Sequence, residues 1–126
     1  PASELASEIL EPLGTVVTLA SEQQFETAAT LGCMHGWVYP WLAAMSVWAE
    51  QQGLDAEAAA ELARSSVAGA VAFSQSMSAD HIAAIGEGIA SEGTYTLAGL
   101  KVLQSGGGIE AWMAAMNTVN DKALGR

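Results

Sequence analysis

The sequence predicts an all-α fold, a bundle of five or six helices behind a short N-terminal helix and strand. Apolar residues recur at helical spacing along most of the chain, and capping residues and glycines bound these stretches. Two long stretches, residues 27–49 and 65–77, contain no Asp, Glu, Lys or Arg. Helices that are apolar on all sides are buried, so we expect much of this surface to lie in a subunit interface.

The N-terminal residues 1–20 predict one helix and one strand. Ser3 precedes a helical pattern that Pro12 and Gly14 end, and TVVTLA, Thr15 to Ala20, is rich in β-branched residues. A lone strand is not stable, so its partners are expected in another chain or in another part of the protein. A helix followed by a strand is how an α/β unit ends, which predicts an upstream domain.

Capping residues begin the first and the third of the helices predicted in residues 21–126. Ser21, with Gln24 three residues later, fits a capping box and begins a helix that runs to about Gly32. Asp55 caps a long helix that is charged only in its first half. Between them lies a helix that tolerates Pro40 in its first turns and stops at Gly53. One face of that helix carries Trp37, Trp41, Met45 and Trp48.

Shorter helices complete the predicted bundle. Ser78 or Asp80 begins one that ends near Gly86 and Gly88. Two more are expected over residues 96–104 and 110–124, separated by three consecutive glycines.

Composition excludes some classes of function. The chain of 126 residues is 51% hydrophobic and carries a formal charge of −10, which argues against binding to a phosphate backbone. Cys33 is the only cysteine, so no internal disulfide and no metal site are expected. The same observation predicts a reducing, cytoplasmic location. The uncharged residues 27–49 are long enough to span a bilayer, but Pro40 and the lack of basic flanks favour a buried interface.

Most candidate chemical groups have a structural alternative. Cys33 and His35 lie two residues apart, so on a helix they point to different sides, and a buried thiol and a core histidine are the preferred interpretation. His81 is expected at the surface. Glu57 and Glu61 could form a carboxylate pair or part of a solvated face, and the latter is preferred.

The polar segment SEGTYT, Ser91 to Thr96, begins an apolar helix. Free backbone N–H groups and hydroxyls at this point could bind an anion at the helix N-terminus. The alternative is an ordinary N-cap in which Ser or Thr satisfies the first turn. Spacing does not decide between them.

SEGTYTLAGLKVLQSGG, residues 91–107, resembles the Ser-Pro-Gly-Gly-Thr-Thr segment, apolar helix and paired glycines of pyrroline-5-carboxylate reductases. GLDAEAAAELARSSVAGA, residues 53–70, resembles the long alanine-rich helix of that family, and TVVTLASEQQFETAATLG, residues 15–32, resembles the end of its nucleotide-binding domain. The resemblance covers nearly the whole chain. It implies a helical dimerisation domain at residues 21–126 and a remnant of a Rossmann domain at residues 1–20.

The resemblance also implies a reaction and its residues. The family reduces 1-pyrroline-5-carboxylate to L-proline with NADPH or NADH, and NADP or NAD would be bound mainly by a Rossmann domain whose glycine-rich fingerprint this chain lacks. Ser91, Gly93, Thr94 and Tyr95 would hold the substrate carboxylate, and Thr96 would assist protonation of the imine nitrogen. A homodimer or higher oligomer is expected.

Departures from the family pattern leave the substrate open. Glu92 replaces a proline, Thr94 a glycine and Tyr95 a threonine, and each change adjoins the implied substrate pocket. The alternatives are therefore a reductase of a different imine or keto compound, or a helical dimerisation module that no longer catalyses.

Overall fold

The computed structural model describes residues 2–125, and these are helical over most of their length. No β-strand occurs within the described residues, so the all-α prediction is confirmed. The elements in chain order, with η for short 3-10 helices, are α1 (Ala2–Leu10), η1 (Glu11–Leu13), α2 (Glu22–Gly32), α3 (Met34–Gln51), α4 (Ala56–Gln75), η2 (Ala79–His81), α5 (Ile82–Ile89), α6 (Tyr95–Ser105) and α7 (Gly108–Ala123).

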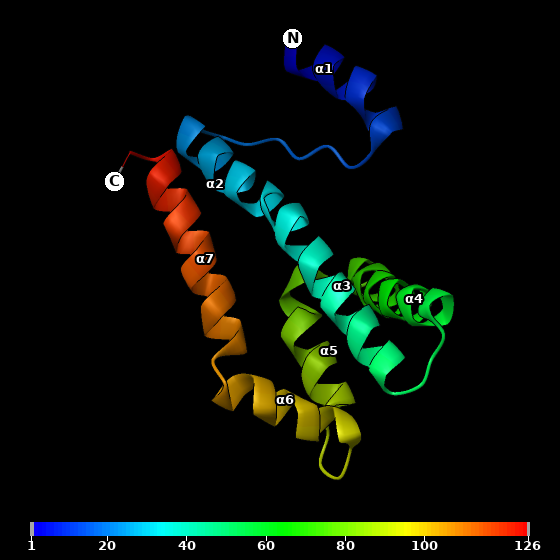
Figure 1. Cartoon of the computed structure of the whole chain (residues 1–126). Helices are drawn as coiled ribbons and strands as arrows, with labels where there is room; N and C mark the ends of the chain where they lie inside the picture. Colours follow the sequence, from blue (N-terminus) through cyan, green and yellow to red (C-terminus); the bar gives the residue numbers. More distant parts are fainter. Residues whose placement is uncertain (1, 126) are drawn as a thin grey trace.

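The predicted strand from Thr15 to Ala20 is not formed. Figure 1 shows this segment as a drawn-out connection that sets α1 apart from the other helices. A strand requires a neighbour for its backbone hydrogen bonds, and no described residue forms a ladder with this segment. The β-branched composition favours an extended backbone, but the chain alone supplies no partner.

The predicted caps at the starts of α2 and α4 are confirmed. Ser21 Oγ accepts a hydrogen bond from the Gln24 N–H at 3.2 Å, while Gln24 Oε1 accepts one from the Ala20 N–H at 2.7 Å. Asp55 Oδ1 accepts a hydrogen bond from the Ala58 N–H at 3.0 Å. These contacts satisfy donors that a helix start leaves without intrahelical partners, and so fix where both helices begin.

The helices form two packed pairs joined by a nearly continuous rod. α2 runs into α3 through Cys33, α3 packs along α4, and α7 packs against α2 and α6 (Figure 1). None of the helices formed by residues 2–125 is both long enough and apolar enough to cross a bilayer. The α3–α4 pair and the α2–α7 pair are the units on which the rest of the molecule is arranged.

The single chain encloses very little core. Among the residues whose burial is described, only Thr30, Ala59 and Ala90 are buried. Residues 65–77 of the long apolar stretch are therefore not buried within one chain, and Phe73 is 54% exposed. The reason is that α3 covers one side of α4 and leaves its other sides open.

Candidate functional site

The Ser91–Thr96 segment forms a tight turn between α5 and α6. The Ser91 carbonyl accepts two hydrogen bonds from Thr94, one from its N–H at 3.2 Å and one from its hydroxyl at 2.8 Å. Gly93 has a φ of 84°, a conformation that side-chain-bearing residues rarely adopt. The turn therefore depends on glycine at this position, and it directs the chain into α6.

Thr94 is the N-cap of α6. Its backbone is extended, and its hydroxyl accepts a hydrogen bond from the Leu97 N–H at 3.1 Å while donating to Ser91. Both functions of this hydroxyl are thus used inside the protein, and the Thr94 N–H is used as well. Thr94 can position a ligand site, but its side chain has no remaining donor for a ligand.

The first turn of α6 keeps two backbone donors without partners in the described structure. These are the N–H groups of Tyr95 and Thr96, since Leu97 is capped and Ala98 donates to the Thr94 carbonyl at 3.3 Å. The hydroxyls of Ser91 and Thr96 flank them, and neither makes a hydrogen bond with described residues. Such a group of donors at the positive end of a helix is suited to a carboxylate.

Two exposed side chains border these donors. The Tyr95 side chain is 98% exposed, and Glu92 lies two residues before the cap and is also exposed. Tyr95 adds bulk, and Glu92 adds a negative charge beside a position where an anion would bind. Both side chains therefore affect which ligands can reach the donors, Tyr95 by its size and Glu92 by its charge.

The two histidines and the cysteine do not form a common site. Cys33 and His35 are both exposed at the junction of α2 and α3, so the expectation of a buried thiol and a core histidine is wrong for the single chain. The cause is the open packing, because no other described helix encloses this junction. Far along the chain, His81 is at the surface as expected, with its Nδ1 2.6 Å from the Ser78 hydroxyl oxygen.

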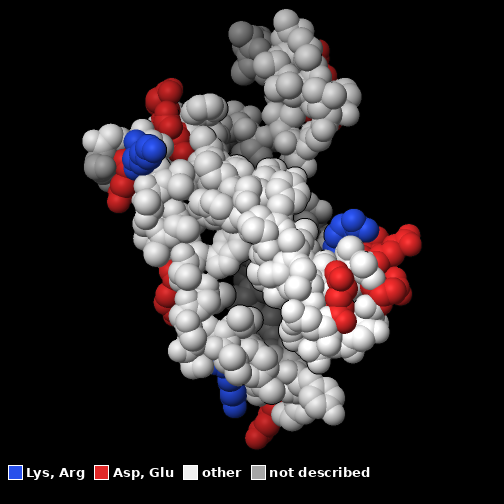
Figure 2. Space-filling view, viewed as in Figure 1, with Lys and Arg blue, Asp and Glu red and all other residues white. Residues whose placement is uncertain are grey.

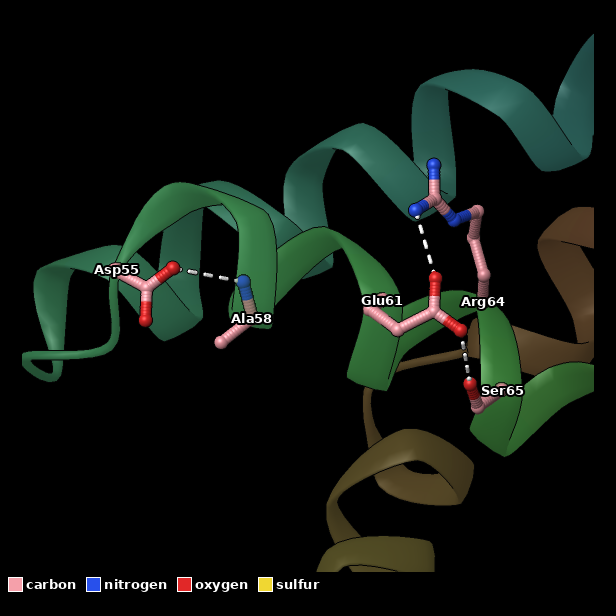
Figure 3. A network of polar contacts seen from close by, with 5 residues as sticks. All are labelled: Asp55, Ala58, Glu61, Arg64 and Ser65. Atoms are coloured by element: carbon pink, nitrogen blue, oxygen red, sulfur yellow. Dashed lines mark hydrogen bonds and ion pairs between the residues drawn. The ribbon is translucent and has the colours of Figure 1, made fainter.

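Glu61 belongs to a solvated polar network on α4 (Figure 3). Arg64 donates a hydrogen bond to Glu61 Oε2 at 2.9 Å, and the Ser65 hydroxyl donates to Glu61 Oε1 at 3.0 Å. The Arg64 hydrogen bond lowers the pKa of the Glu61 carboxyl below its ordinary value, and the Ser65 hydrogen bond lowers it further. Because Glu61 pairs with these residues and not with Glu57, the solvated-face interpretation is confirmed.

The described residues do not fit a metal ion or a dinucleotide. No group of three or more His, Cys, Asp or Glu side chains among residues 2–125 is placed to hold a metal. A dinucleotide pyrophosphate is usually cradled by a glycine-rich turn between a strand and a helix. The described elements include no strand, so this part of the protein offers no such cradle.

The comparisons with known proteins agree with this fold. A family model described as pyrroline-5-carboxylate reductase dimerisation matches residues 22–125. The structure is similar to a pyrroline-5-carboxylate reductase from Coxiella burnetii, with a TM-score of 0.85 and 28% identity, over 97% of this chain and 45% of that chain. A comparison with the curated proteins found no match.

A second solved structure shows the same helical arrangement. It is the Plasmodium falciparum pyrroline carboxylate reductase with NADP bound, with a TM-score of 0.82 and 20% identity, over 96% of this chain and 46% of that chain. At this level of identity the likeness concerns the fold. The chain spans less than half the length of both solved proteins.

Proposed function

Because the chain belongs to the pyrroline-5-carboxylate reductase dimerisation family, we propose that it is the dimerisation and substrate domain of an NAD(P)H-dependent reductase. The reaction is the reduction of 1-pyrroline-5-carboxylate to L-proline in proline biosynthesis, in the cytoplasm. Residues 21–126 form the helical domain, and residues 1–20 are the end of a nucleotide-binding domain that holds NADP or NAD. The protein acts as a homodimer or higher oligomer and binds neither nucleic acid nor membrane.

The observation that carries the proposal is the pair of free backbone donors at the start of α6. The N–H groups of Tyr95 and Thr96, with the Ser91 hydroxyl, would donate hydrogen bonds to the substrate carboxylate at the positive end of the helix. Gly93 and Thr94 would hold the turn in place, since the Thr94 hydroxyl already bonds Ser91 and Leu97. These hydrogen bonds support a proposal in which backbone atoms bind the carboxylate and the cap positions them.

Thr96 is the residue proposed to act on the reacting atoms. Its hydroxyl lies on the first turn of α6, beside the free N–H groups, and makes no hydrogen bond with the described residues. It would donate a hydrogen bond to the imine nitrogen, which assists protonation and makes the adjacent carbon a better hydride acceptor. The hydride itself would come from NADPH or NADH bound by the nucleotide-binding domain.

Steady-state kinetics on the protein that contains this chain together with its nucleotide-binding domain test the proposal. NADPH oxidation should depend on 1-pyrroline-5-carboxylate, and Thr96→Val should lower kcat by about 100-fold, the usual size of one general acid–base contribution. Thr118→Val is the matched control, because Thr118 is an exposed helical threonine whose hydroxyl bonds only the Ala114 carbonyl. Equal rates for wild type and Thr96→Val would remove Thr96 from the mechanism.

Glu92 and Tyr95 give reason for a second candidate. A negative charge and a large ring beside the donors favour a different imine or keto substrate, or a dimerisation module without catalysis. Titration of the same protein with proline separates these alternatives. Binding without turnover of 1-pyrroline-5-carboxylate favours a changed substrate, whereas no binding favours the inactive module.

A further inference from the structure

The N-terminal arm, formed by α1 and η1, joins the other helices through one connection, residues 14–20. Figure 1 shows α1 set apart from the other helices, with this connection drawn out between the arm and the start of α2. Every residue of the connection is exposed except the partly buried Val16. The direction in which the arm leaves the helical body therefore depends on contacts at the start of α2.

A single side chain of α2 holds the end of this connection. Within the described residues, the connection makes two hydrogen bonds: Gly14 N–H donates back to the Glu11 carbonyl, and Ala20 N–H donates to Gln24 Oε1 at 2.7 Å. Only the second of these reaches the helical body. Gln24 is itself fixed, because its own N–H donates to Ser21 Oγ at 3.2 Å. Gln24 thus spans the joint between the connection and the helix.

Leu19 shows that the connection turns back beside α2. It lines an open hollow of about 530 Å³ together with Gln24, Thr27 and Leu31 of that helix. Leu19 is 37% exposed, whereas Val17, two residues earlier, is 71% exposed. Since Thr27 and Leu31 lie beyond the first turn of α2, the end of the connection runs along the helix and does not continue straight off its end. The Gln24 hydrogen bond holds the chain at this bend.

Charge works against this arrangement. Residues 1–63 contain no Lys or Arg, whereas the arm carries Glu4, Glu8 and Glu11, and α2 carries Glu22 and Glu26. Figure 2 shows acidic side chains on the arm, and the basic side chains lie elsewhere on the molecule. Like charges on the arm and on α2 repel each other. The position of the arm therefore depends on the Gln24 hydrogen bond and on Leu19, and not on charge attraction to α2.

We propose that Gln24 is a positioning residue, which through Ala20 N–H fixes the direction in which the nucleotide-binding domain leaves the helical domain. The inference rests on the proposed function, in which residues 1–20 are the end of that domain. Reacting atoms must lie about 3–3.5 Å apart in a reactive arrangement. A domain that swings about its connection spends less time in that arrangement. Gln24 acts through the backbone of the connection and not on the reacting atoms.

Kinetics on the protein that contains this chain together with its nucleotide-binding domain test this role. Gln24→Met keeps the length of the side chain and removes the acceptor, so kcat should fall about five-fold, the change that one hydrogen bond typically makes to an equilibrium. The KM for 1-pyrroline-5-carboxylate should stay within about two-fold of wild type, because the donors of α6 are unchanged. Gln24→Glu keeps an acceptor for Ala20 N–H and should restore kcat.

Two matched variants separate positioning from helix stability. Ser21→Ala removes the hydrogen bond that Gln24 N–H donates but keeps the one that Gln24 Oε1 accepts, so it should weaken the start of α2 without lowering kcat. Gln23→Met makes the same substitution one residue earlier, where the side chain makes no hydrogen bond with the described residues. It should behave as wild type.

Hydrogen exchange, followed by mass spectrometry, measures the joint without turnover. In Gln24→Met the amide of Ala20 should exchange about five-fold faster than in wild type, because it loses its acceptor. In Gln24→Glu, Ser21→Ala and Gln23→Met it should exchange close to the wild-type rate. This readout reports on the connection itself and not on the reaction.

The outcomes separate this inference from the proposed function. An unchanged kcat or unchanged exchange in Gln24→Met overturns the inference and leaves the proposed function intact. A loss of kcat in Ser21→Ala as large as in Gln24→Met also overturns it, since helix stability then explains both. A wild-type protein that does not oxidise NADPH with 1-pyrroline-5-carboxylate overturns the proposed function and, with it, the role of Gln24 in the reaction.

Discussion

The indole rings of Trp37 and Trp112 meet edge to face, with ring centroids 5.9 Å apart and planes inclined at 70°. Trp37 lies near the start of α3 and Trp112 near the start of α7, so this contact joins two helices that are distant in the sequence. Both side chains are only partly exposed. In a chain that encloses so little core, this aromatic pair adds a contact between α3 and α7 to the packing of α7 against α2.

Loss of this aromatic pair should weaken the fold measurably. Trp112→Leu should lower the free energy of unfolding by about 2 kcal/mol, and Trp112→Phe by less, because phenylalanine retains an aromatic edge. A double-mutant cycle with Trp37→Leu should give a coupling of about 1 kcal/mol. Urea unfolding at one fixed protein concentration measures these values. Additive effects of the two substitutions would show that the rings do not interact.

Removal of the α6 cap should destabilise the helix start. Thr94→Ala should cost about 1 kcal/mol, because the Leu97 N–H and the Ser91 carbonyl both lose a partner. Thr94→Ser keeps the hydroxyl and should cost less than half as much. Thr96→Ala is a control two residues further along, because the Thr96 hydroxyl has no partner among the described residues. A lower melting temperature for Thr96→Ala than for Thr94→Ala would contradict this assignment of the cap.

The melting temperature should depend on protein concentration. With so few buried residues in one chain, folding and association are expected to be coupled, and mass action then stabilises the folded dimer as concentration rises. Calorimetry over a 100-fold range should show the melting temperature rising steadily by several degrees. A constant melting temperature over this range would mean that the monomer folds by itself.

The Glu61 carboxyl should titrate below its ordinary pKa of 4.5. Its hydrogen bonds favour the charged form in the folded state, so their stabilising effect is present above the unfolded-state pKa. It is lost as the pH falls through the lowered folded-state pKa. Arg64→Gln should move the pKa back up toward 4.5, and high salt should move it the same way by screening. Carbon-13 NMR of the carboxyl resonance follows the titration, and an unchanged pKa in Arg64→Gln would exclude Arg64 as the main cause.

Much of the secondary structure could be predicted because local interactions decide it. Ser21 and Asp55 cap their helices through atoms three residues away, so sequence spacing is sufficient to place α2 and α4. The end of α3 near Gly53 is also local, because Gly53 has a φ of 101°. The segment from Thr15 to Ala20 shows the limit, because β-branched residues favour an extended backbone but a strand also needs a neighbour.

The sequence indicates a candidate segment for the site, but it does not give the structural roles of that segment's residues. The segment from Ser91 to Thr96 was identified from its composition and its resemblance to a known motif. Sequence alone could not tell whether Thr94 or a neighbour caps α6, because several residues in the segment can supply a hydroxyl. The three-dimensional turn decides it, since only the Thr94 hydroxyl lies within reach of both Leu97 and Ser91.

The sequence by itself determined most of the helices, the caps of α2 and α4, and the presence of long uncharged stretches. Only the tertiary structure decided which sides of those stretches remain open, for that depends on how far apart the helices lie. The groove between Trp48 and Leu62 exists because α3 covers one side of α4 and no other helix formed by residues 2–125 packs along the adjacent side. The composition determines how much hydrophobic surface the chain has, but the packing of the helices determines where that surface stays exposed.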